Sequence, residues 1–416
     1  MGPSENLMRL PTERLHTWFR QGSRRGSRKM VKDEKSTGPL VGYRVLEFAN
    51  MISGPFCGQM LADLGADVVK VEAPEGDGFR ALRPEHGGLG AHFLHFNRGK
   101  RSVTLDLKSE KDLAAARDLV RKADVVIENF RPGVMKRLGL DYETLKESNP
   151  KLVYLSITGF GKDGPYAQRP AFDQVIQAIT GFMWTQGEQI EPQPIRNPVV
   201  DKVTSLTGCN AVVSALLHRE RTGCGQHIGV SLLDAYAAFM MPGVTVNETF
   251  VDAGISPLPP RAVYRVIATR DGHVIGNIHS NAQFAGSARA FGRPELLEDP
   301  RFKDPRSRQG HLAEMWSELA DAARHRTTEE VLQAAVAEGV PLAAVQTMEE
   351  FLHDPQVAHN EVFMDYHDPK LGRIRQLNFP ARFSGSPVNV NARAPMLGEH
   401  TDEVFADWER EAIEPC

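Results

Sequence analysis

The chain has 416 residues, 41% of them hydrophobic, which is enough to bury a sizeable core and to build about two domains. A formal net charge of −4 gives no indication of nucleic-acid binding. The four cysteines lie far apart without a CxxC pair, which argues against a disulfide framework or a metal site and indicates a reducing compartment such as the cytoplasm. No apolar run reaches the roughly 18 residues of a membrane helix, so we expect a soluble protein.

The first 38 residues differ in composition from the rest. Residues 1–40 hold nine Lys or Arg against four Asp or Glu and show no strand pattern, so 1–38 is predicted to be a disordered basic extension. An Arg-rich start is also typical of a mitochondrial transit peptide, although Glu5 and Glu13 are unusual in one. Two interpretations therefore stay open: a mitochondrial matrix protein, or a cytoplasmic one that starts at Met30 or carries a cloned extension.

From Gly42 onward, short apolar strands alternate with helices. Residues 43–48 predict a strand, Ser53 with Pro55 is typical of the start of a helix that ends near Leu64, and 67–72 predict the next strand. Further strands are predicted at 102–107, 124–127 and 152–157, and helices at 109–123, 173–180 and 204–221. Capping boxes are predicted for Ser109 with Asp112 and for Thr327 with Glu330. This alternation predicts an α/β fold, a Rossmann-like parallel sheet with helices on both faces.

The pattern changes after a proline-rich connector at 257–260. Alternating residues on both sides of Asp271-Gly272 predict a hairpin of 263–268 with 273–278, and helical patterns follow to about residue 339. Later strands at 361–366 and 373–379 and a helix from Thr401 suggest that the chain returns to its first domain. The predicted layout is a large domain at 39–210 completed by 380–416, a linker at 211–250, a small α+β domain at 251–345 and a return linker at 346–379.

Polar and charged side chains follow the strand at 124–127. Asn129, Phe130 and Arg131 place an amide, an aromatic face and a guanidinium where an open α/β sheet binds ligands, outside the carboxyl ends of its strands. Asp173 follows 34 residues beyond Gly139. The combination indicates a site for a nucleotide thioester.

Together with four further stretches, this pattern resembles the class III CoA-transferase family, which includes formyl-CoA transferase, carnitine CoA-transferase and the α-methylacyl-CoA racemases. The stretches are 46–55, 61–72, 97–102 and 397–404, and the resemblance runs from about Pro39 to the C-terminus. It implies a homodimer whose two subunits are threaded through each other as interlocked rings. It also implies an acyl-CoA donor and a carboxylic acid acceptor as substrates, with no permanently bound cofactor and no metal.

The resemblance makes Asp173 the catalytic nucleophile. An ordinary aspartate is ionised at pH 7 and needs no base to activate it. Its attack on a donor thioester would give an aspartyl anhydride, CoA would return to form an aspartyl-CoA thioester, and the acceptor acid would take CoA through a second anhydride. A single Asp before a helix is more often a cap, so the matching motifs carry this assignment.

The resemblance also implies contacts to CoA. Met51 and Ile52 would lie beside the adenosine and pantetheine, Asn129 and Phe130 beside the pantetheine and thioester, and Arg137 beside a phosphate. Further candidates for the pyrophosphate and 3′-phosphate are Arg98, Lys100, Arg101, Arg131 and Lys136.

Alternative functions differ in their sequence requirements. A racemase of this fold pairs a His with the Asp, whereas Phe172 precedes Asp173 and no histidine occurs in 97–217. A NAD oxidoreductase would need a GxGxxG turn after the first strand, which is missing. A non-catalytic CoA-binding protein remains as a third alternative.

The stretch 275–283 limits the choice of substrate. It lacks the run of glycines that oxalate-using members carry there, so formyl-CoA to oxalate transfer is not expected. His279 and Asn281 are candidates to contact the acceptor carboxylate. Family analogy alone suggests succinyl-CoA or another short dicarboxylyl-CoA as the donor, and leaves the acceptor open.

Overall fold

The structure is a computed structural model that describes residues 37–187, 190–252, 254 and 265–408. Nearly all of the predicted basic extension and the proline-rich connector at 257–260 lie outside these residues. The remaining predictions on elements can be compared with the structure directly.

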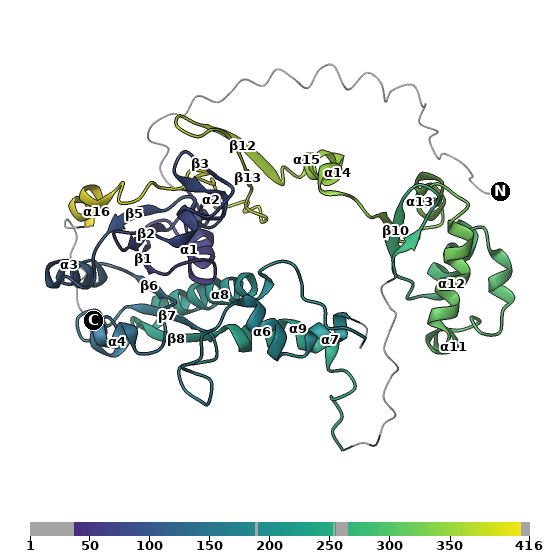
Figure 1. Cartoon of the computed structure of the whole chain (residues 1–416), viewed down its shortest axis with the longest axis horizontal. Helices are drawn as coiled ribbons and strands as arrows, with labels where there is room; N and C mark the ends of the chain where they lie inside the picture. Colours follow the sequence, from purple (N-terminus) through teal and green to yellow (C-terminus); the bar gives the residue numbers. More distant parts are fainter. Residues whose placement is uncertain (1–36, 188–189, 253, 255–264, 409–416) are drawn as a thin grey trace, which may run out of the picture. The chain divides into compact units, whose positions relative to one another are not determined.

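A six-stranded parallel sheet in the order β5-β2-β1-β6-β7-β8 is the centre of the fold (Figure 1). Its strands are β1 Arg44–Phe48, β2 Asp67–Glu72, β5 Arg101–Thr104, β6 Val125–Glu128, β7 Val153–Thr158 and β8 Gln226–Ser231. The chain leaves β1 in one direction through β2 and β5, and continues on the other side through β6, β7 and β8. The strand order therefore reverses between β1 and β6, which is where open α/β sheets bind ligands.

Helices cover both faces of this sheet, which confirms the predicted α/β class. Val45, Val125 and Ile127 pack with α1 (Ser53–Asp63) and α8 (Val199–Thr222) in one hydrophobic core. On the other face, Leu46 and Val126 pack in a second core with α3 (Glu110–Arg121) and α16 (Thr401–Trp408). Strands buried on both faces explain the continuous apolar runs in the sequence.

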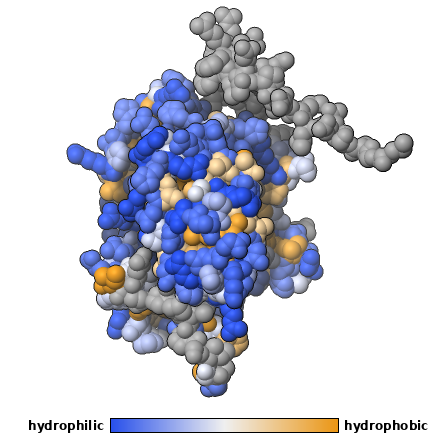
Figure 2. Space-filling view, turned by 90° about the vertical axis from the view of Figure 1, so that its right-hand side faces the viewer, coloured by the Kyte–Doolittle hydropathy of each residue, from blue (hydrophilic) through white to orange (hydrophobic). Residues whose placement is uncertain are grey.

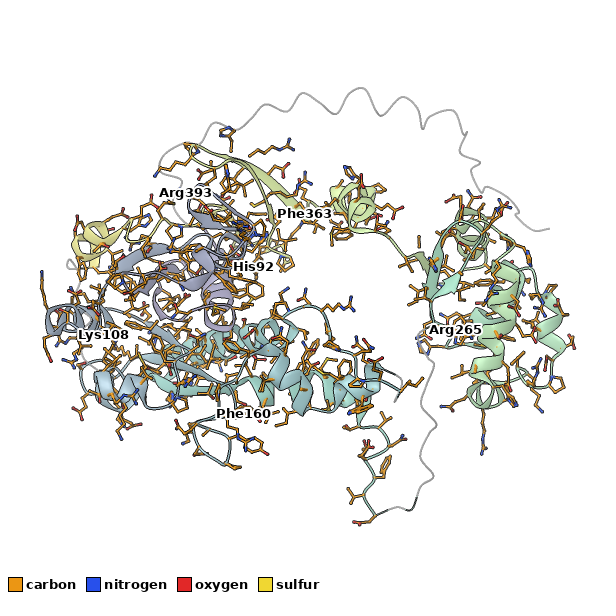
Figure 3. The ribbon with its side chains drawn as sticks, in the orientation of Figure 1. His92, Lys108, Phe160, Arg265, Phe363 and Arg393 are labelled. Carbon is orange, nitrogen blue, oxygen red and sulfur yellow. The ribbon has the colours of Figure 1, made fainter. Side chains whose placement is uncertain are left out.

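Glycine allows a close contact at the carboxyl end of β7. A Cβ added to Gly159 would lie 2.3 Å from the Cβ of Ala171, so only glycine fits there. The neighbouring Phe160, labelled in Figure 3, packs edge-on against Tyr166 with ring centroids 5.6 Å apart. These contacts hold the segment before Asp173 against the carboxyl end of β7.

The segment 211–250, predicted to be a linker, instead holds the end of α8, the edge strand β8 and helix α9 (Leu232–Val244). β8 has the sequence Gln-His-Ile-Gly-Val-Ser and is only partly buried, so its strand pattern is weak. The predicted capping box of α3 is also wrong. Ser109 makes no side-chain cap, and the Asp112 carboxylate accepts from the backbone N–H of Asp106 at 2.9 Å.

Residues 265–344 have a hydrophobic core of their own, which includes Phe302 and Trp316. A three-stranded sheet β11-β10-β9 contains the predicted hairpin, with β9 Ile267–Ala268 antiparallel to β10 His273–Gly276 and β11 Leu342–Ala344 on its other side. The capping box of Thr327 with Glu330 is present at the start of α13. The helices here are α10 Asn281–Ala290, η4 Pro294–Glu298, α11 Pro305–Gly310, α12 Leu312–Ala323 and α13 Thr328–Ala337.

The predicted late strands form the antiparallel hairpin β12 (Phe363–Asp368) and β13 (Gly372–Leu377). Gln376 in β13 donates to the carbonyl of Leu94 in α2 (Ala91–Asn97) at 3.0 Å, so this hairpin contacts the large-sheet region. The shorter elements are η3 Gly78–Arg80, β3 Glu85–His86, β4 Leu89–Gly90, α2 Ala91–Asn97, α4 Val134–Leu138, α5 Tyr142–Leu145, α6 Asp173–Ile179, α7 Phe182–Gln186, α14 Met348–His353 and α15 Pro355–His359. The predicted domain limits, apart from the linker at 211–250, stay predictions.

Within the described ranges, no helix is both long enough and apolar enough to cross a membrane. Figure 2 shows one face of the molecule, which is mostly hydrophilic with some apolar side chains gathered near its centre.

Candidate functional site

Asp173 is the first residue of α6, and its carboxylate faces into the protein with 2% of the residue exposed. Oδ1 accepts a hydrogen bond from Gln177 Nε2 at 2.6 Å. Oδ2 accepts from the backbone N–H groups of Val200 at 2.7 Å and Asp201 at 3.2 Å, in the first turn of α8. Those N–H groups have no partner within their own helix, and the helix dipole places partial positive charge on them. All three of these contacts are hydrogen-bond donors directed at the carboxylate oxygens of Asp173.

Gln177 holds Oδ1 from a fixed position, one helical turn after Asp173. Its amide is fully buried, its Nε2 lies 3.2 Å from the carbonyl of Ile195, and its Oε1 accepts from the Ile195 N–H at 2.9 Å. A carboxylate offers about two lone pairs on each oxygen. Within the described part of the chain, Oδ2 accepts two hydrogen bonds and Oδ1 accepts one, so one lone pair of Oδ1 has no protein donor.

Three ionisable side chains lie within electrostatic reach of Asp173. Burial, and then the negative charge of Asp173, raise the pKa of Asp201 to about 7. Burial raises the pKa of Tyr236 to about 12, with the same charge as the second cause. Burial lowers the pKa of Lys202, opposed by Asp173, and its Nζ donates to Asn197 Oδ1 at 2.8 Å. With this raised pKa, Asp201 binds a proton more readily than an ordinary aspartate does.

Asn129 fixes the loop that follows β1. Its Oδ1 accepts from the Asn50 N–H at 3.0 Å, and its Nδ2 lies 2.8 Å from the Asn50 carbonyl and 3.3 Å from Ser53 Oγ. Met51, the next residue, has a φ of +69° and an N–H that donates to Asp77 Oδ2 at 3.1 Å. Such a φ is unfavourable for a residue with a Cβ, so the surrounding contacts must hold this loop in place. Met51 is 39% exposed and is available to a ligand.

A hydrogen-bonded chain connects this loop with Asp173. The hydroxyl of Ser205 in α8 lies 2.8 Å from the Ser53 carbonyl and 2.7 Å from the Asp201 carbonyl. Asp201 in turn donates its N–H to Asp173, and Ser53 Oγ contacts Asn129. The structure therefore brings Asp173 and Asn129 to the same end of the sheet.

Ile52 and Phe130 supply apolar surface beside the two loops. Ile52 is 7% exposed and packs in a small core below its loop, whereas Phe130 is partly buried against the core that contains α3. The Phe130 N–H donates to Glu128 Oε2 at 2.9 Å. Burial raises the pKa of Glu128 to about 7, against the opposing effect of hydrogen bonds from Ser156 and Phe130.

Arg131, Lys136 and Arg137 lie on the surface just after β6, in or next to α4. Among the residues that the structure describes, none of the ion pairs involves these three cations. Three exposed, unpaired cations within seven residues are suited to a ligand with several phosphates.

The other three predicted phosphate ligands have partners inside the protein. The pairs are Arg98 with Asp63 at 2.8 Å, Lys100 with Glu47 at 2.8 Å, and Arg101 with Asp67 at 2.5 Å. The side chains of Arg98 and Lys100 are 4% and 0% exposed. Because their charges are already compensated, we leave these three residues out of the proposed phosphate contacts. The sequence shows their charge but not partners that lie more than 30 positions away.

Sequence reasoning missed a group of buried ionised side chains below the loop 49–55. Lys70 Nζ contacts Glu47 Oε1 and Asp77 Oδ2, both at 3.1 Å, and donates to the Ala49 carbonyl at 2.5 Å. Lys100 Nζ donates to the Pro55 carbonyl at 2.7 Å. Together with the contact from Asp77 to Met51, the group holds the loop at three places. The sequence did contain a sign of this group, because Glu47 and Lys70 interrupt the apolar strands β1 and β2.

Comparison with known proteins identifies relatives along nearly the whole chain. The sequence profile described as CoA-transferase family III matches residues 40–401. A succinate–glutarate CoA-transferase of Agrobacterium fabrum is 37% identical over 387 residues, which cover 89% of this chain and 96% of that protein. A succinyl-CoA–D-citramalate CoA-transferase of Chloroflexus aurantiacus is 34% identical, over 91% and 96% of the two chains. Among solved structures, a CAIB/BAIF family protein from Brucella suis has a TM-score of 0.77 at 37% identity, covering 89% of this chain and all of the other.

Proposed function

Because this chain belongs to CoA-transferase family III, we propose that it transfers CoA from an acyl-CoA, such as succinyl-CoA, to a free carboxylic acid through covalent intermediates on Asp173. The observation that carries this proposal is the position of that carboxylate, buried between Gln177 and the first turn of α8. The names of the two relatives support short dicarboxylic acids as substrates.

The first step uses the free lone pair on Oδ1 of Asp173. Oδ1 attacks the thioester carbonyl, a C–O bond forms, the C–S bond breaks, and CoA thiolate leaves with the electron pair. The product is an acyl aspartyl anhydride. Gln177 keeps the side chain oriented during this step through its contact at 2.6 Å.

The second step uses the two N–H groups at Oδ2. When CoA thiolate attacks Cγ of Asp173, negative charge develops on Oδ2, which already has the N–H groups of Val200 and Asp201 at 2.7 and 3.2 Å. Donors placed in advance at a developing oxyanion stabilise the transition state. The donor's acyl carboxylate then leaves, and an aspartyl-CoA thioester remains.

The acceptor acid completes the exchange by the same chemistry in reverse. Its carboxylate attacks the aspartyl thioester to form a second anhydride, and CoA thiolate attacks the acceptor's carbonyl, which releases the new acyl-CoA and the free Asp173. Water would hydrolyse either intermediate. The 2% exposure of Asp173 favours transfer over hydrolysis.

CoA binds, in this proposal, across the place where the strand order reverses. Met51, Ile52, Asn129 and Phe130 contact the pantetheine and adenosine. Arg131, Lys136 and Arg137 bind the phosphates.

We also propose the interlocked homodimer that the family resemblance implies. Leu206 and Leu217 on α8 are 55% and 53% exposed in the single chain, and a partner subunit would cover such side chains.

Initial-rate assays test the proposed function. Purified protein would be given succinyl-CoA and a panel of carboxylic acids, and new acyl-CoA products would be followed by mass spectrometry. We expect transfer by the wild type and by the matched control Asp118→Asn, an exposed aspartate on α3, but not by Asp173→Asn. Transfer by Asp173→Asn at the wild-type rate would overturn the proposal.

A further inference from the structure

A second site, separate from Asp173 in sequence, is a pocket of about 260 Å³ between the segment after β10 and helices α11 and α12. Asn277, His279, Arg308 and Trp316 line it, together with apolar side chains. The segment 275–283, whose role the sequence left open, forms one wall. The positive charge of Arg308 in this lining indicates the kind of ligand that the pocket could bind.

Arg308 is a buried cation for which the described residues provide no ion pair. It is 5% exposed, and its guanidinium donates to the Phe302 carbonyl at 2.8 Å and to Asn281 Oδ1 at 2.5 Å, both uncharged acceptors. No carboxylate in the described part of the chain forms an ion pair with it. The nearby Asp304 uses its carboxylate oxygens on Ser307, both at 2.9 Å.

Burial lowers the pKa of Arg308 from its usual range, and the charge of Asp304 only partly opposes this effect. Guanidinium groups nevertheless stay protonated in proteins. A buried charge without a counter-ion costs several kcal/mol. Among the described residues, two of its five N–H groups have hydrogen-bond acceptors, and the guanidinium also lies 4.8 Å from the centre of the Phe284 ring, so an anion entering the pocket could accept from the remaining N–H groups.

Two further side chains that line the pocket carry N–H donors. Trp316 is 1% exposed, and within the described ranges its Nε1–H has no hydrogen-bond partner. The Oδ1 of Asn277 accepts from the Ile278 N–H at 2.9 Å, which leaves its NH₂ group for a ligand. Leu312 and Met315 add apolar wall. One anionic group with a short hydrocarbon chain matches this lining.

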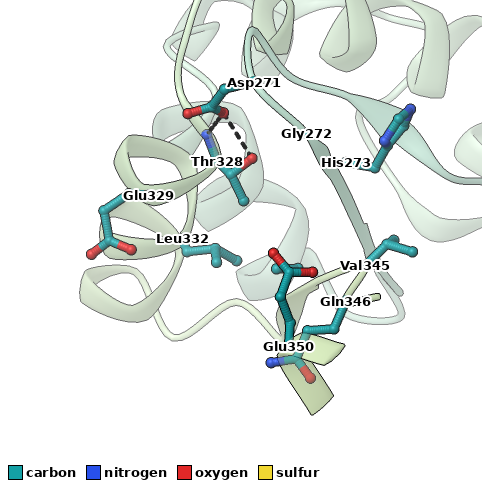
Figure 4. Close-up of a pocket in the computed structure, with 10 residues that line it drawn as sticks. Asp271, Gly272, His273, Thr328, Glu329, Leu332, Val345, Gln346 and Glu350 are labelled. Carbon is teal, nitrogen blue, oxygen red and sulfur yellow. Dashed lines mark hydrogen bonds between the residues drawn. The ribbon is translucent and has the colours of Figure 1, made fainter. Parts of the chain in front are cut away.

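Another pocket, of about 380 Å³ and lined in part by α13, has the opposite character (Figure 4). Asp271, Glu329 and Glu350 line it, and Asp271 is held by the backbone N–H and the hydroxyl of Thr328 at 2.7 and 2.9 Å. Its carboxylates would repel an organic acid. Of these two pockets, the one that contains Arg308 is therefore the one suited to an anion.

We propose that the Arg308 pocket binds the carboxylate of a small organic acid, with the guanidinium and the Trp316 N–H as donors. The acid is the acceptor of CoA, and in that respect the inference rests on the proposed function. Planar, bidentate recognition of a carboxylate is what a guanidinium provides best. His279, at the exposed rim, is a further donor to the same acid.

Equilibrium binding tests the pocket without any turnover. Glutarate would be titrated into the Asp173→Asn protein by calorimetry, in that background alone and combined with Arg308→Gln. The matched control is Arg306→Gln, an exposed arginine two residues away on the same helix. We expect Arg308→Gln to weaken glutarate binding about 10- to 100-fold, as for loss of a hydrogen-bonded charge, and Arg306→Gln to leave it unchanged.

Equal weakening by both substitutions would overturn the proposal, as would tighter binding of inorganic phosphate than of glutarate. If Arg308→Gln fails to fold, Trp316→Phe gives the second test, since it removes the N–H and keeps an aromatic ring. Unchanged glutarate affinity in that variant would also count against the site.

Steady-state kinetics of Arg308→Gln, with Asp173 intact, distinguish two roles of the bound acid: acceptor of CoA or effector. A rise in KM for the acceptor acid in Arg308→Gln, with KM for acyl-CoA within about twofold, supports the acceptor role. If Arg308→Gln loses glutarate binding but keeps the wild-type KM for the acceptor acid, the pocket does bind an acid. That acid is then an effector, and the acceptor role is overturned. Because the binding data need no catalysis, they stay readable even if the wild type transfers no CoA.

Discussion

Replacing Lys100 by Met should lower the stability of the folded protein, because Lys100 belongs to a buried group in which positive and negative charges balance. Its Nζ contacts Glu47 and Asn97, each at 2.8 Å, and the Pro55 carbonyl at 2.7 Å, with the side chain 0% exposed. The group has three cations and three carboxylates: Lys70, Arg80 and Lys100 with Glu47, Glu72 and Asp77. Methionine has a similar volume but leaves one carboxylate in excess.

The size of the effect follows from the burial. Removing one partner of a buried ion pair costs about 3–5 kcal/mol, because the other charge stays uncompensated. Burial lowers the pKa of Lys100 to about 8, with Glu47 opposing, so the side chain is still mostly charged at pH 7. At roughly 2–4 °C per kcal/mol for a large domain, we expect the Tm to fall by about 6–20 °C.

Thermal and urea denaturation at pH 7, followed by circular dichroism, would measure this loss. Lys108→Met is the matched control, since Lys108 is exposed and outside the group. Adding Glu47→Gln to Lys100→Met restores the charge balance, so the double variant should lose less stability than the sum of the two single variants. A loss for Lys100→Met within about 0.5 kcal/mol of that for Lys108→Met would refute the reasoning.

Three further predictions concern other parts of the molecule. Arg137→Gln should raise KM for acyl-CoA about 5- to 10-fold in steady-state assays with little change in kcat, because it would remove the proposed phosphate contact; an unchanged KM would exclude that contact. Folding raises the pKa of Asp201 from 3.8 to about 7, so between these pH values the folded protein binds one proton that the unfolded chain does not. The free energy of unfolding of the wild type, measured by urea titration relative to Asp201→Asn, should therefore fall as the pH rises from about 4 to 7. A difference that stays constant over this pH range would contradict this prediction. Thr327→Ala removes the cap of α13 and should cost about 1 kcal/mol in the same titrations, with Thr222→Ala as a control that caps no helix start.

The sequence was sufficient for most of the sheet. β1, β2, β6 and β7 are apolar runs because helices cover them on both sides, so each could be located from its own residues. β8 was missed, since an edge strand with Gln226, His227 and Gly229 depends on pairing with β7 more than on its own pattern.

The candidate site, too, could be predicted from the sequence only in part. Asp173 and Asn129 stand next to local motifs, and these motifs are what led to their prediction as site residues. Their partners could not, because the N–H groups of Val200 and Asp201 are 27 and 28 residues from Asp173, and no side chain marks a backbone donor. The sequence shows that Lys100 is charged. It does not show that this charge is paired inside the protein, because the partner Glu47 lies 53 residues away.

Covalent labelling of Asp173 tests the central proposal most directly. The protein would be mixed with succinyl-CoA in deuterated water, quenched with acid within seconds, digested and analysed by peptide mass spectrometry, with Asp173→Asn and Asp118→Asn in parallel. We expect a CoA or succinyl adduct on the peptide that contains Asp173 in the wild type and in Asp118→Asn, and none in Asp173→Asn. Product formation without any adduct on that peptide, or deuterium at the α-carbon of the recovered acyl-CoA, would contradict transfer through an aspartyl intermediate.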